Sequence, residues 1–327
     1  MNKDEIIQFC NSIGLDTIGF IKCRVFEELR EFYLDRKENG LENEFEEQDI
    51  NKRIDPSIYM EDGKTIISIA FPSHMGEEDI NNGFSIYTKG YDYHRVVKSY
   101  LDKVCAYINE HGGKAISLVD SNSLPERYIG YLAGVGVIGK NNMLITKKYG
   151  SYVFLGEIIT DLEIECTDKG TFDDVTKYKE CKECNLCIDA CPTKAIISGR
   201  KNPNICSSYI TQKKNLSNVD YKLIKNRIFG CDICQNSCPY NKDISFSSLE
   251  EFRPLDFMNN DDINYYANLN NKNFKEKISK TSCGWRGKNI IRRNAIIKLY
   301  NEGKDIEQFR GDSSVINECI EELIKNS

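Results

Sequence analysis

The sequence predicts an α+β protein: a mixed α/β N-terminal part, a ferredoxin-like cysteine-rich part and a small helical, HEAT-like tail. Three observations lead to this fold class. Residues 64–71 form an unbroken run dominated by apolar and β-branched side chains, which is typical of a buried strand. Residues 93–108 place apolar side chains at helical spacing. Eight of the 14 cysteines lie between Cys181 and Cys238, so a compact segment is expected around them.

The other elements each rest on a local pattern. Apolar residues recur every three or four positions in the expected helices, and they alternate or cluster in the expected strands. We expect helices at 3–13, 27–52, 91–108, 126–133 and 285–300, and strands at 16–21, 64–71, 114–119, 143–145 and 152–159. The last two strands are expected to form a hairpin across a turn at 149–150.

Composition limits the class of protein. The 327 residues are 40% hydrophobic and 29% charged, and they contain no apolar run long enough to cross a membrane. The first helix carries acidic residues, unlike a secretory signal, so a cytoplasmic location is expected. The net charge is −6, yet residues 272–304 hold ten Lys or Arg against two Glu, a local charge of +8. This segment fits either a polyanionic partner such as RNA or a solvated helical face.

The cysteines follow the spacing of an iron–sulfur protein. The first run reads C-x2-C-x2-C-x3-C-P, and the second is a three-cysteine run that also ends in C-P. In two-cluster ferredoxins the cysteine before the proline ligates the other cluster. We therefore expect two [4Fe–4S] clusters, one on Cys181, Cys184, Cys187 and Cys238, the other on Cys231, Cys234, Cys206 and Cys191. Two structural zinc sites are the alternative.

Residues 134–139 match G-x-G-x-x-G, the fingerprint of a dinucleotide site. That fingerprint requires a strand before the glycines and a helix after them, because the pyrophosphate binds at the helix N-terminus. Here a helix is expected before the glycines. We therefore expect a turn that lets the backbone approach a different large cofactor.

Several blocks along the chain resemble the epoxyqueuosine reductases. These are cobalamin-dependent iron–sulfur enzymes that complete queuosine in the tRNA anticodon and are related to reductive dehalogenases. The blocks are residues 53–56, Tyr87 with 92–94, 119–121, 126–127, 133–140, 151–156, both cysteine runs, 228–231 and 292–295. The chain departs from the family in having Ile86 where an Arg is usual and Val137 where a Trp is usual, and its Pro125 lies further from the aspartate.

The resemblance implies a cobalamin domain at 1–165, a two-cluster domain at 166–245 and a basic helical region at 246–327. It implies that Asp120 is the general acid, a role that desolvation would support by keeping the carboxyl neutral. An aspartate that merely caps the turn at 120–122 is the alternative. Cofactor contacts are expected from Tyr93, His94, Gly134, Gly136, Gly139 and Lys140, and tRNA phosphate contacts from Lys288, Arg292 and Arg293.

The cobalamin is expected to be base-off, because no D-x-H-x-x-G motif occurs in the sequence. A small electron donor such as a ferredoxin or flavodoxin is expected to supply electrons. Two alternatives stay open. One is a different corrinoid iron–sulfur reductase acting on a small molecule, and the other is a non-catalytic two-cluster electron-transfer protein.

Overall fold

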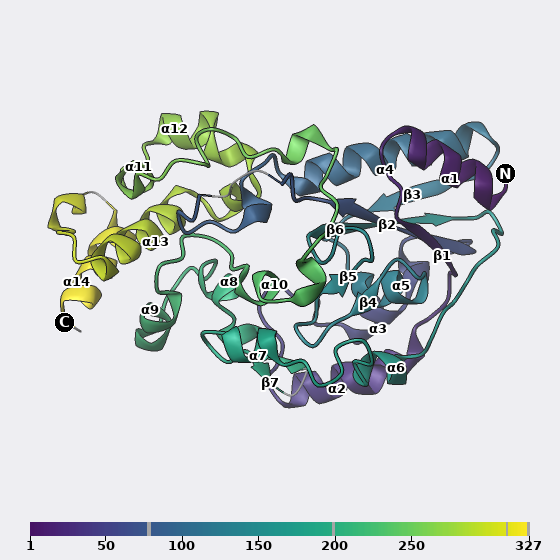
Figure 1. Ribbon diagram of the computed structural model, residues 1–327, viewed down its shortest axis with the longest axis horizontal. Coiled ribbons are helices and arrows are strands. Elements are labelled where there is room, and N and C mark those ends of the chain that lie inside the picture. The colour runs from purple at the N-terminus through teal and green to yellow at the C-terminus, as the bar shows by residue number, and fades with distance from the viewer. Residues whose placement is uncertain (77–79, 198–199, 312, 326–327) are drawn as a thin grey trace.

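The computed structural model describes residues 1–76, 80–197, 200–311 and 313–325 (Figure 1). Its N-terminal part is built on a four-stranded antiparallel sheet with the order β1-β2-β6-β3. The strands are β1 (Ile18–Lys22), β2 (Thr65–Pro72), β3 (Ala115–Leu118) and β6 (Val153–Thr160). Every residue of β2 is buried, as the apolar run at 64–71 predicts.

Helices cover both faces of this sheet (Figure 1). Side chains of β2 alternate between the two cores: Ile67 and Ile69 pack with α1 (Lys3–Ser12) and α4 (Tyr93–Glu110), whereas Ile66 packs toward the other face. That second face is covered by α2 (Arg30–Glu38), α3 (Ile50–Ile54) and α5 (Glu126–Leu132). The two-residue period of the strand therefore serves two hydrophobic cores at once.

The expected hairpin between 143–145 and 152–159 is wrong. A small hairpin does form, but it joins β4 (Val137–Ile138) to β5 (Leu144–Ile145). Strand β6 instead lies between β2 and β3, where its apolar residues are buried on both faces. The burial of its apolar side chains in the large sheet determines how β6 pairs, although the short connection between 145 and 152 had suggested a local hairpin.

The cysteine-rich part consists of short elements. They are α6 (Phe172–Thr176), α7 (Leu186–Ala190), β7 (Ile196–Ile197), β8 (Arg200–Lys201), α8 (Ser207–Ile210), α9 (Asn218–Ile224) and α10 (Ile233–Asn236). Single 3₁₀ turns connect many elements of the chain: Glu27–Leu29, Pro56–Ile58, Ile86–Thr88, Pro203–Ile205, Pro239–Asn241, Glu250–Phe252, Ile278–Lys280, Ser282–Arg286 and Glu307–Phe309.

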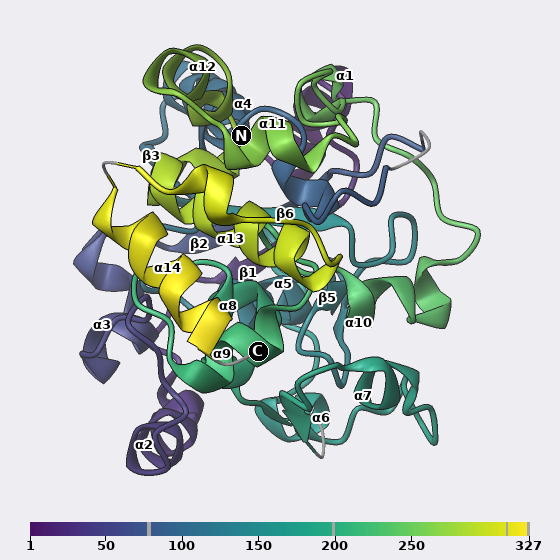
Figure 2. The ribbon, with the colours of Figure 1, turned by 90° about the vertical axis from the view of Figure 1, so that its left-hand side faces the viewer.

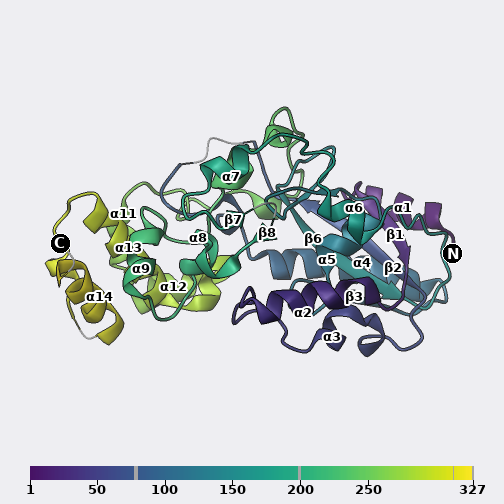
Figure 3. The ribbon, with the colours of Figure 1, turned by 90° about the horizontal axis from the view of Figure 1, so that it is seen from below.

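The C-terminal part contains α11 (Ile263–Ala267), α12 (Asn271–Glu276), α13 (Lys288–Asn301) and α14 (Ser314–Lys325). Figures 1 and 3 show α13 and α14 at the end of the molecule opposite to α1, and in Figure 2 this end faces the viewer. Their core also includes Phe84, Ile228 and Phe229 from other parts of the chain. Phe84 and Phe229 form a parallel β-bridge, so the cysteine-rich and C-terminal parts share one hydrophobic core.

The chain also returns to the N-terminal sheet after the second cysteine run, where Leu249 and Phe252 pack into the core of α1 and α4. The domain ranges 1–165, 166–245 and 246–327 stay a prediction. In the part of the chain that the structure describes, no helix is both long and apolar enough to cross a bilayer.

Candidate functional site

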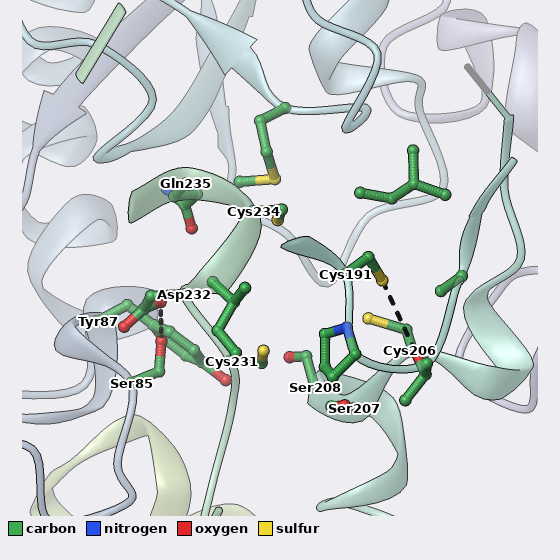
Figure 4. A pocket seen from close by; sticks show the side chains of 16 residues that line it. Ser85, Tyr87, Cys191, Cys206, Ser207, Ser208, Cys231, Asp232, Cys234 and Gln235 are labelled. Carbon is green, nitrogen blue, oxygen red and sulfur yellow. Dashed lines mark hydrogen bonds between the residues drawn. The ribbon is translucent and has the colours of Figure 1, made fainter. Parts of the chain in front are cut away.

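Four cysteines line a small cavity of about 150 Å³ beside α7, α8 and α10 (Figure 4). They are Cys191, Cys206, Cys231 and Cys234, the set that the sequence predicts for one cluster. Cys206 is brought there by the turn that begins α8, and Asp232 fixes the α10 side by accepting hydrogen bonds from Ser85 Oγ and from the Ile86 amide, the latter at 2.7 Å. Three separate segments therefore deliver this set of thiols.

The other four cysteines also lie together. Burial raises the pKa of the Cys187 thiol to about 11, and the neighbouring Cys181, Cys238 and Cys184 add to this effect. Among the described residues, no three Cys, His, Asp or Glu groups converge tightly enough to hold a single metal ion. The cysteines of each predicted set thus lie close together, and their assignment to two clusters stays a prediction.

Two cationic side chains, those of Lys140 and Arg227, donate hydrogen bonds to the cysteine-containing segments. Lys140 Nζ donates to the carbonyl oxygens of Lys182 and Cys184, at 2.8 Å and 3.0 Å, and to Asn185 Oδ1 at 3.0 Å. Arg227 Nε donates to Cys231 Sγ at 3.2 Å. Its three acceptors hold Lys140 against the first cysteine loop, and the predicted contact of Lys140 with the large cofactor stays a prediction.

The three glycines of the 134–139 segment serve the packing of the hairpin. A Cβ on Gly136 would lie 2.6 Å from the Ile145 carbonyl oxygen, and one on Gly139 would lie 2.8 Å from Ile145 Cδ1. Gly134 has a φ of +73° and follows α5, where a left-handed residue ends the helix. None of the three is among the residues that line the large cleft described below, and their predicted cofactor contacts stay a prediction.

Asp120 lies in a strained turn directly after β3. Its φ is +40°, an uncommon value for a residue with a side chain. Tyr93 Oη donates a hydrogen bond to Oδ2 of Asp120, and His94 Nε2 lies 3.2 Å from the same oxygen. The Tyr93 ring is held by parallel stacking on Phe154, with 4.2 Å between the ring centroids. Two neighbouring residues at the start of α4 therefore converge on one carboxylate oxygen.

The pKa of Asp120 contradicts the expectation that desolvation keeps its carboxyl neutral. Burial raises the pKa of Asp120, but the hydrogen bonds from His94 and Tyr93 outweigh it and leave the pKa below its ordinary value. Burial lowers the pKa of His94, but its hydrogen bonds to Asp120 and Asp92 raise it to about 9. Asp120 is thus ionised at neutral pH, and the proton resides on His94.

Two buried carboxyls lie behind the Asp120 turn. Glu126 Oε1 accepts hydrogen bonds from the Asp120 amide at 2.8 Å and from Asn122 Nδ2 at 2.7 Å. Burial, helped by the charge of Asp120, raises the pKa of Glu126 to about 7. Burial also raises the pKa of Glu157 on β6 well above its ordinary value, and the neighbouring Glu126 adds to this. Glu126 therefore holds the turn that presents Asp120.

A cleft of about 950 Å³ connects these groups. Its walls come from α2 and the 43–47 loop, from the 120–128 segment, from 172–178 and from residues 203–212. Asp120 lies on one side of it and Cys206 on another, and Cys206 also lines the four-cysteine cavity. The cleft thus places the Asp120 carboxylate and the second set of cysteines around a single space.

The three residues predicted to contact phosphates differ in exposure, since one is buried and two are partly exposed. Arg293 is only 2% exposed and donates to the Lys214 carbonyl oxygen at 2.7 Å and to Asn294 Oδ1 at 3.0 Å, so its predicted phosphate contact is wrong. Its position faces the interior because α13 is covered on nearly every side. Lys288 Nζ bonds Asn271 Oδ1 at 2.8 Å, and Arg292 Nε bonds the Ala267 carbonyl oxygen at 2.9 Å. Both are partly exposed, and their contacts with RNA stay a prediction.

Comparisons with known proteins agree with this architecture. Residues 180–241 match the family model described as a 4Fe-4S double cluster binding domain, and residues 53–121 match the model described as "Epoxyqueuosine reductase QueG, DUF1730". The epoxyqueuosine reductase of Lactococcus garvieae is 37% identical over 310 residues, which cover 91% of this chain and 86% of that protein. The chain belongs to the epoxyqueuosine reductase family.

Solved structures of epoxyqueuosine reductases have the same fold. A crystal structure of one with an epoxyqueuosine-modified tRNA-Tyr stem loop superposes with a TM-score of 0.88 at 32% identity, covering 98% of this chain and 90% of that one. A Bacillus subtilis epoxyqueuosine reductase, described with its catalytic aspartate loop swung out of the active site, gives a TM-score of 0.85 at 31% identity with the same coverage. The likeness therefore extends over nearly the whole chain.

Sequence reasoning missed some residues of this epoxyqueuosine reductase-like site. Glu157 interrupts the apolar strand 153–160, and a lone carboxylate in a buried strand was a signal that could have been used. Phe45 and Tyr209, which line the cleft, lie in segments with no distinctive pattern. Only the folded chain brings these two rings together.

Proposed function

We propose that this protein reduces the epoxide of epoxyqueuosine in tRNA to the alkene of queuosine. The reaction consumes two electrons and two protons and releases the epoxide oxygen as water. One observation carries the proposal: Asp120, a proton-handling carboxylate, and Cys206, from the second set of cysteines, line the same cleft. Electron delivery and proton delivery therefore meet in one space.

The two [4Fe–4S] clusters are assigned to the two sets of cysteines. Cys181, Cys184, Cys187 and Cys238 would hold the first, and Cys191, Cys206, Cys231 and Cys234 the second. The mutual proximity of each set supports this assignment, as does the match to a double-cluster family model. The second cluster is adjacent to the cleft, so it would make the last electron transfer, and a small ferredoxin or flavodoxin would supply the first cluster.

The cleft fits base-off cobalamin in size, since about 950 Å³ is at the upper end of the usual range for ligand pockets. Asp120, Ile138, Asn142, Cys206 and Tyr209 are among the residues that would surround it. When bound, this cofactor supplies the low-potential chemistry that amino-acid side chains lack.

The side chains around Asp120 would manage the protons. His94 carries a proton that lies 3.2 Å from Asp120 Oδ2, and Tyr93 Oη donates to the same oxygen. Closure of the cleft around a substrate would remove water from Asp120 and so favour transfer of that proton from His94 Nε2 to Asp120 Oδ2. The protonated carboxyl would then donate to the leaving oxygen as a general acid.

The finer features of the proposal follow from this substrate. A tRNA substrate places the enzyme in the cytoplasm, and the α11–α14 region, which we infer to be HEAT-like, would contact the RNA with Lys288 and Arg292. The test is anaerobic reconstitution with iron, sulfide and cobalamin, followed by incubation with excess dithionite as the electron source and a stem loop that carries epoxyqueuosine. About eight irons and one cobalt per chain are expected, with loss of one oxygen atom from the nucleoside by mass spectrometry. Full metal loading without that loss would contradict the proposal.

A further inference from the structure

Three aromatic side chains from distant parts of the sequence meet at the rim of the cleft. Phe45 follows α2, Tyr209 lies in α8 and Trp285 lies in the 3₁₀ turn before α13. The Phe45 ring centroid is 5.3 Å from that of Tyr209 and 5.3 Å from that of Trp285, both in edge-to-face arrangement. Phe45 and Tyr209 line the cleft. We call these three rings the aromatic rim.

The aromatic rim is unusually exposed for such large apolar groups. Trp285 keeps 56% of its surface accessible and Phe45 keeps 42%. Single exposed apolar residues are common, but rings clustered beside a functional cleft are typical of a binding surface. The exposure of these rings therefore indicates that the aromatic rim binds another molecule.

Arg286 lies against two rings of the aromatic rim and pairs with Glu44. Its guanidinium carbon is 4.6 Å from the Trp285 ring centroid and 5.3 Å from that of Phe45. The side chain is only 8% exposed, and Nε and Nη2 have no hydrogen-bond partner among the described residues. The carboxylate of Glu44 lies 3.7 Å from Nη2 and forms an ion pair with it. The guanidinium therefore supports the Trp285 and Phe45 rings from the protein side, as a cation placed on an aromatic face does.

We propose that the aromatic rim stacks an unpaired base of the RNA loop that flanks the nucleotide entering the cleft. This inference rests on the proposed function, because it takes the RNA substrate from there. Bases of single-stranded loops stack on aromatic rings and on Arg guanidinium planes, whereas paired stems expose no base faces. The guanidinium covers one face of the indole, which leaves the rest of the exposed ring for a base.

Charge favours RNA over a protein as the occupant. Trp285 and Arg286 belong to the 272–304 segment, whose local charge is +8, and Lys272, Lys275 and Lys280 of this segment are exposed. A polyanion would be attracted to these exposed lysines, which lie in the same segment as Trp285. The continuity of the rim with the cleft places the stacked base next to the reacting nucleotide.

Trp285 is the only tryptophan in the chain, so its fluorescence reports on the rim directly. The reconstituted enzyme is titrated with a dye-labelled anticodon stem loop while RNA anisotropy and Trp285 emission are recorded together. We expect emission to be quenched with the same midpoint as the rise in anisotropy. A blunt duplex without a loop should leave the emission unchanged.

The variant Trp285→Ala should bind the stem loop about tenfold more weakly, because one base loses its stacking partner. Trp285→Phe should retain most of the affinity, and Phe246→Ala is the matched control, since Phe246 is 54% exposed and lies outside the cleft lining. RNA binding without quenching, together with unchanged affinity of Trp285→Ala, would overturn the rim proposal and leave the proposed function standing. Absence of any stem-loop binding by the wild-type enzyme would overturn both.

A further outcome would also overturn the rim proposal. If Trp285→Ala changes the sedimentation of the enzyme alone while RNA affinity is kept, the aromatic rim is an interface between copies of this chain.

Discussion

His94 Nε2 lies 3.2 Å from Asp120 Oδ2, while His94 Nδ1 lies 2.8 Å from Asp92 Oδ1. The imidazole thus bridges two carboxylates at the start of α4, and this arrangement raises its pKa to about 9. Asp92 and Asp120 both have a lowered pKa, because their hydrogen bonds outweigh the effect of burial. The site stores one proton beside the cleft without keeping a neutral carboxyl.

His94 should set the alkaline limit of activity. Because its pKa is raised, its proton is held at neutral pH and lost as the pH rises through about 9. Activity of the wild-type enzyme should therefore decline above that pH. His94→Gln should lower the rate by about 10²–10⁴-fold, the usual contribution of a proton-transfer group, and should abolish this alkaline limb. An unchanged pH–rate profile in the variant would show that His94 does not carry the proton.

Glu126 should act as a positioning residue for the Asp120 turn. Its Oε1 accepts from the Asp120 amide and from Asn122, and a Gln side chain can keep both contacts through its own oxygen. Glu126→Gln should therefore retain most of the activity, whereas Glu126→Ala should lose about tenfold, the equivalent of about 1.4 kcal/mol. Equal losses in the two variants would point to the charge of Glu126 and not to its contacts.

Lys140 should protect the first cluster. Removing the ammonium group leaves three oxygen acceptors of the 182–185 segment without their donor. Lys140→Ala should lose iron from the first cluster on exposure to air sooner than the wild-type enzyme, as followed by iron content and visible absorbance. Lys64→Ala removes an exposed lysine elsewhere and should behave as wild type. Equal rates of iron loss in all three proteins would contradict the role.

Arg227 should tune the second cluster. A charge-assisted hydrogen bond to a cluster sulfur stabilises the more negative, reduced state and so raises the reduction potential. Arg227→Gln should therefore lower the potential of the second cluster and leave the first unchanged in an anaerobic redox titration monitored by electron paramagnetic resonance. A shift of the first cluster alone would place the thiol of Cys231 in the other cluster.

Much of the fold follows from local patterns in the sequence. The strand at 65–72 and the helix at 93–110 fall where the apolar periodicity predicts them, because burial on both faces or on one stripe leaves a clear signature. The grouping of Cys206 with the distant runs was also predicted, since ligand number in clusters is fixed. The pairing of β6 could not be foreseen, because strand partners depend on burial in the assembled sheet.

In the functional site, too, some features follow from the sequence and others appear only in the folded structure. Motif spacing indicates the cysteines and the family resemblance indicates Asp120, but the directions of the side chains determine the other contacts. Lys140 turns toward a cysteine loop and Arg293 toward the interior, although both looked like exposed cations in the sequence. The protonation state of Asp120 depends on Tyr93 and His94, which lie 27 and 26 positions away in the chain, respectively. Spatial neighbours, which no local pattern records, determine these features.

The measurement that tests the central claim most directly is a single-turnover assay of Asp120→Asn. Fully loaded, pre-reduced wild-type and variant enzymes are mixed with a stem loop carrying epoxyqueuosine, and the nucleoside is analysed by mass spectrometry. The amide keeps the size of the carboxyl but cannot deliver its proton, so conversion should slow by about 10²–10⁴-fold while metal content and stem-loop affinity stay unchanged. Conversion at the wild-type rate by the variant would contradict the account.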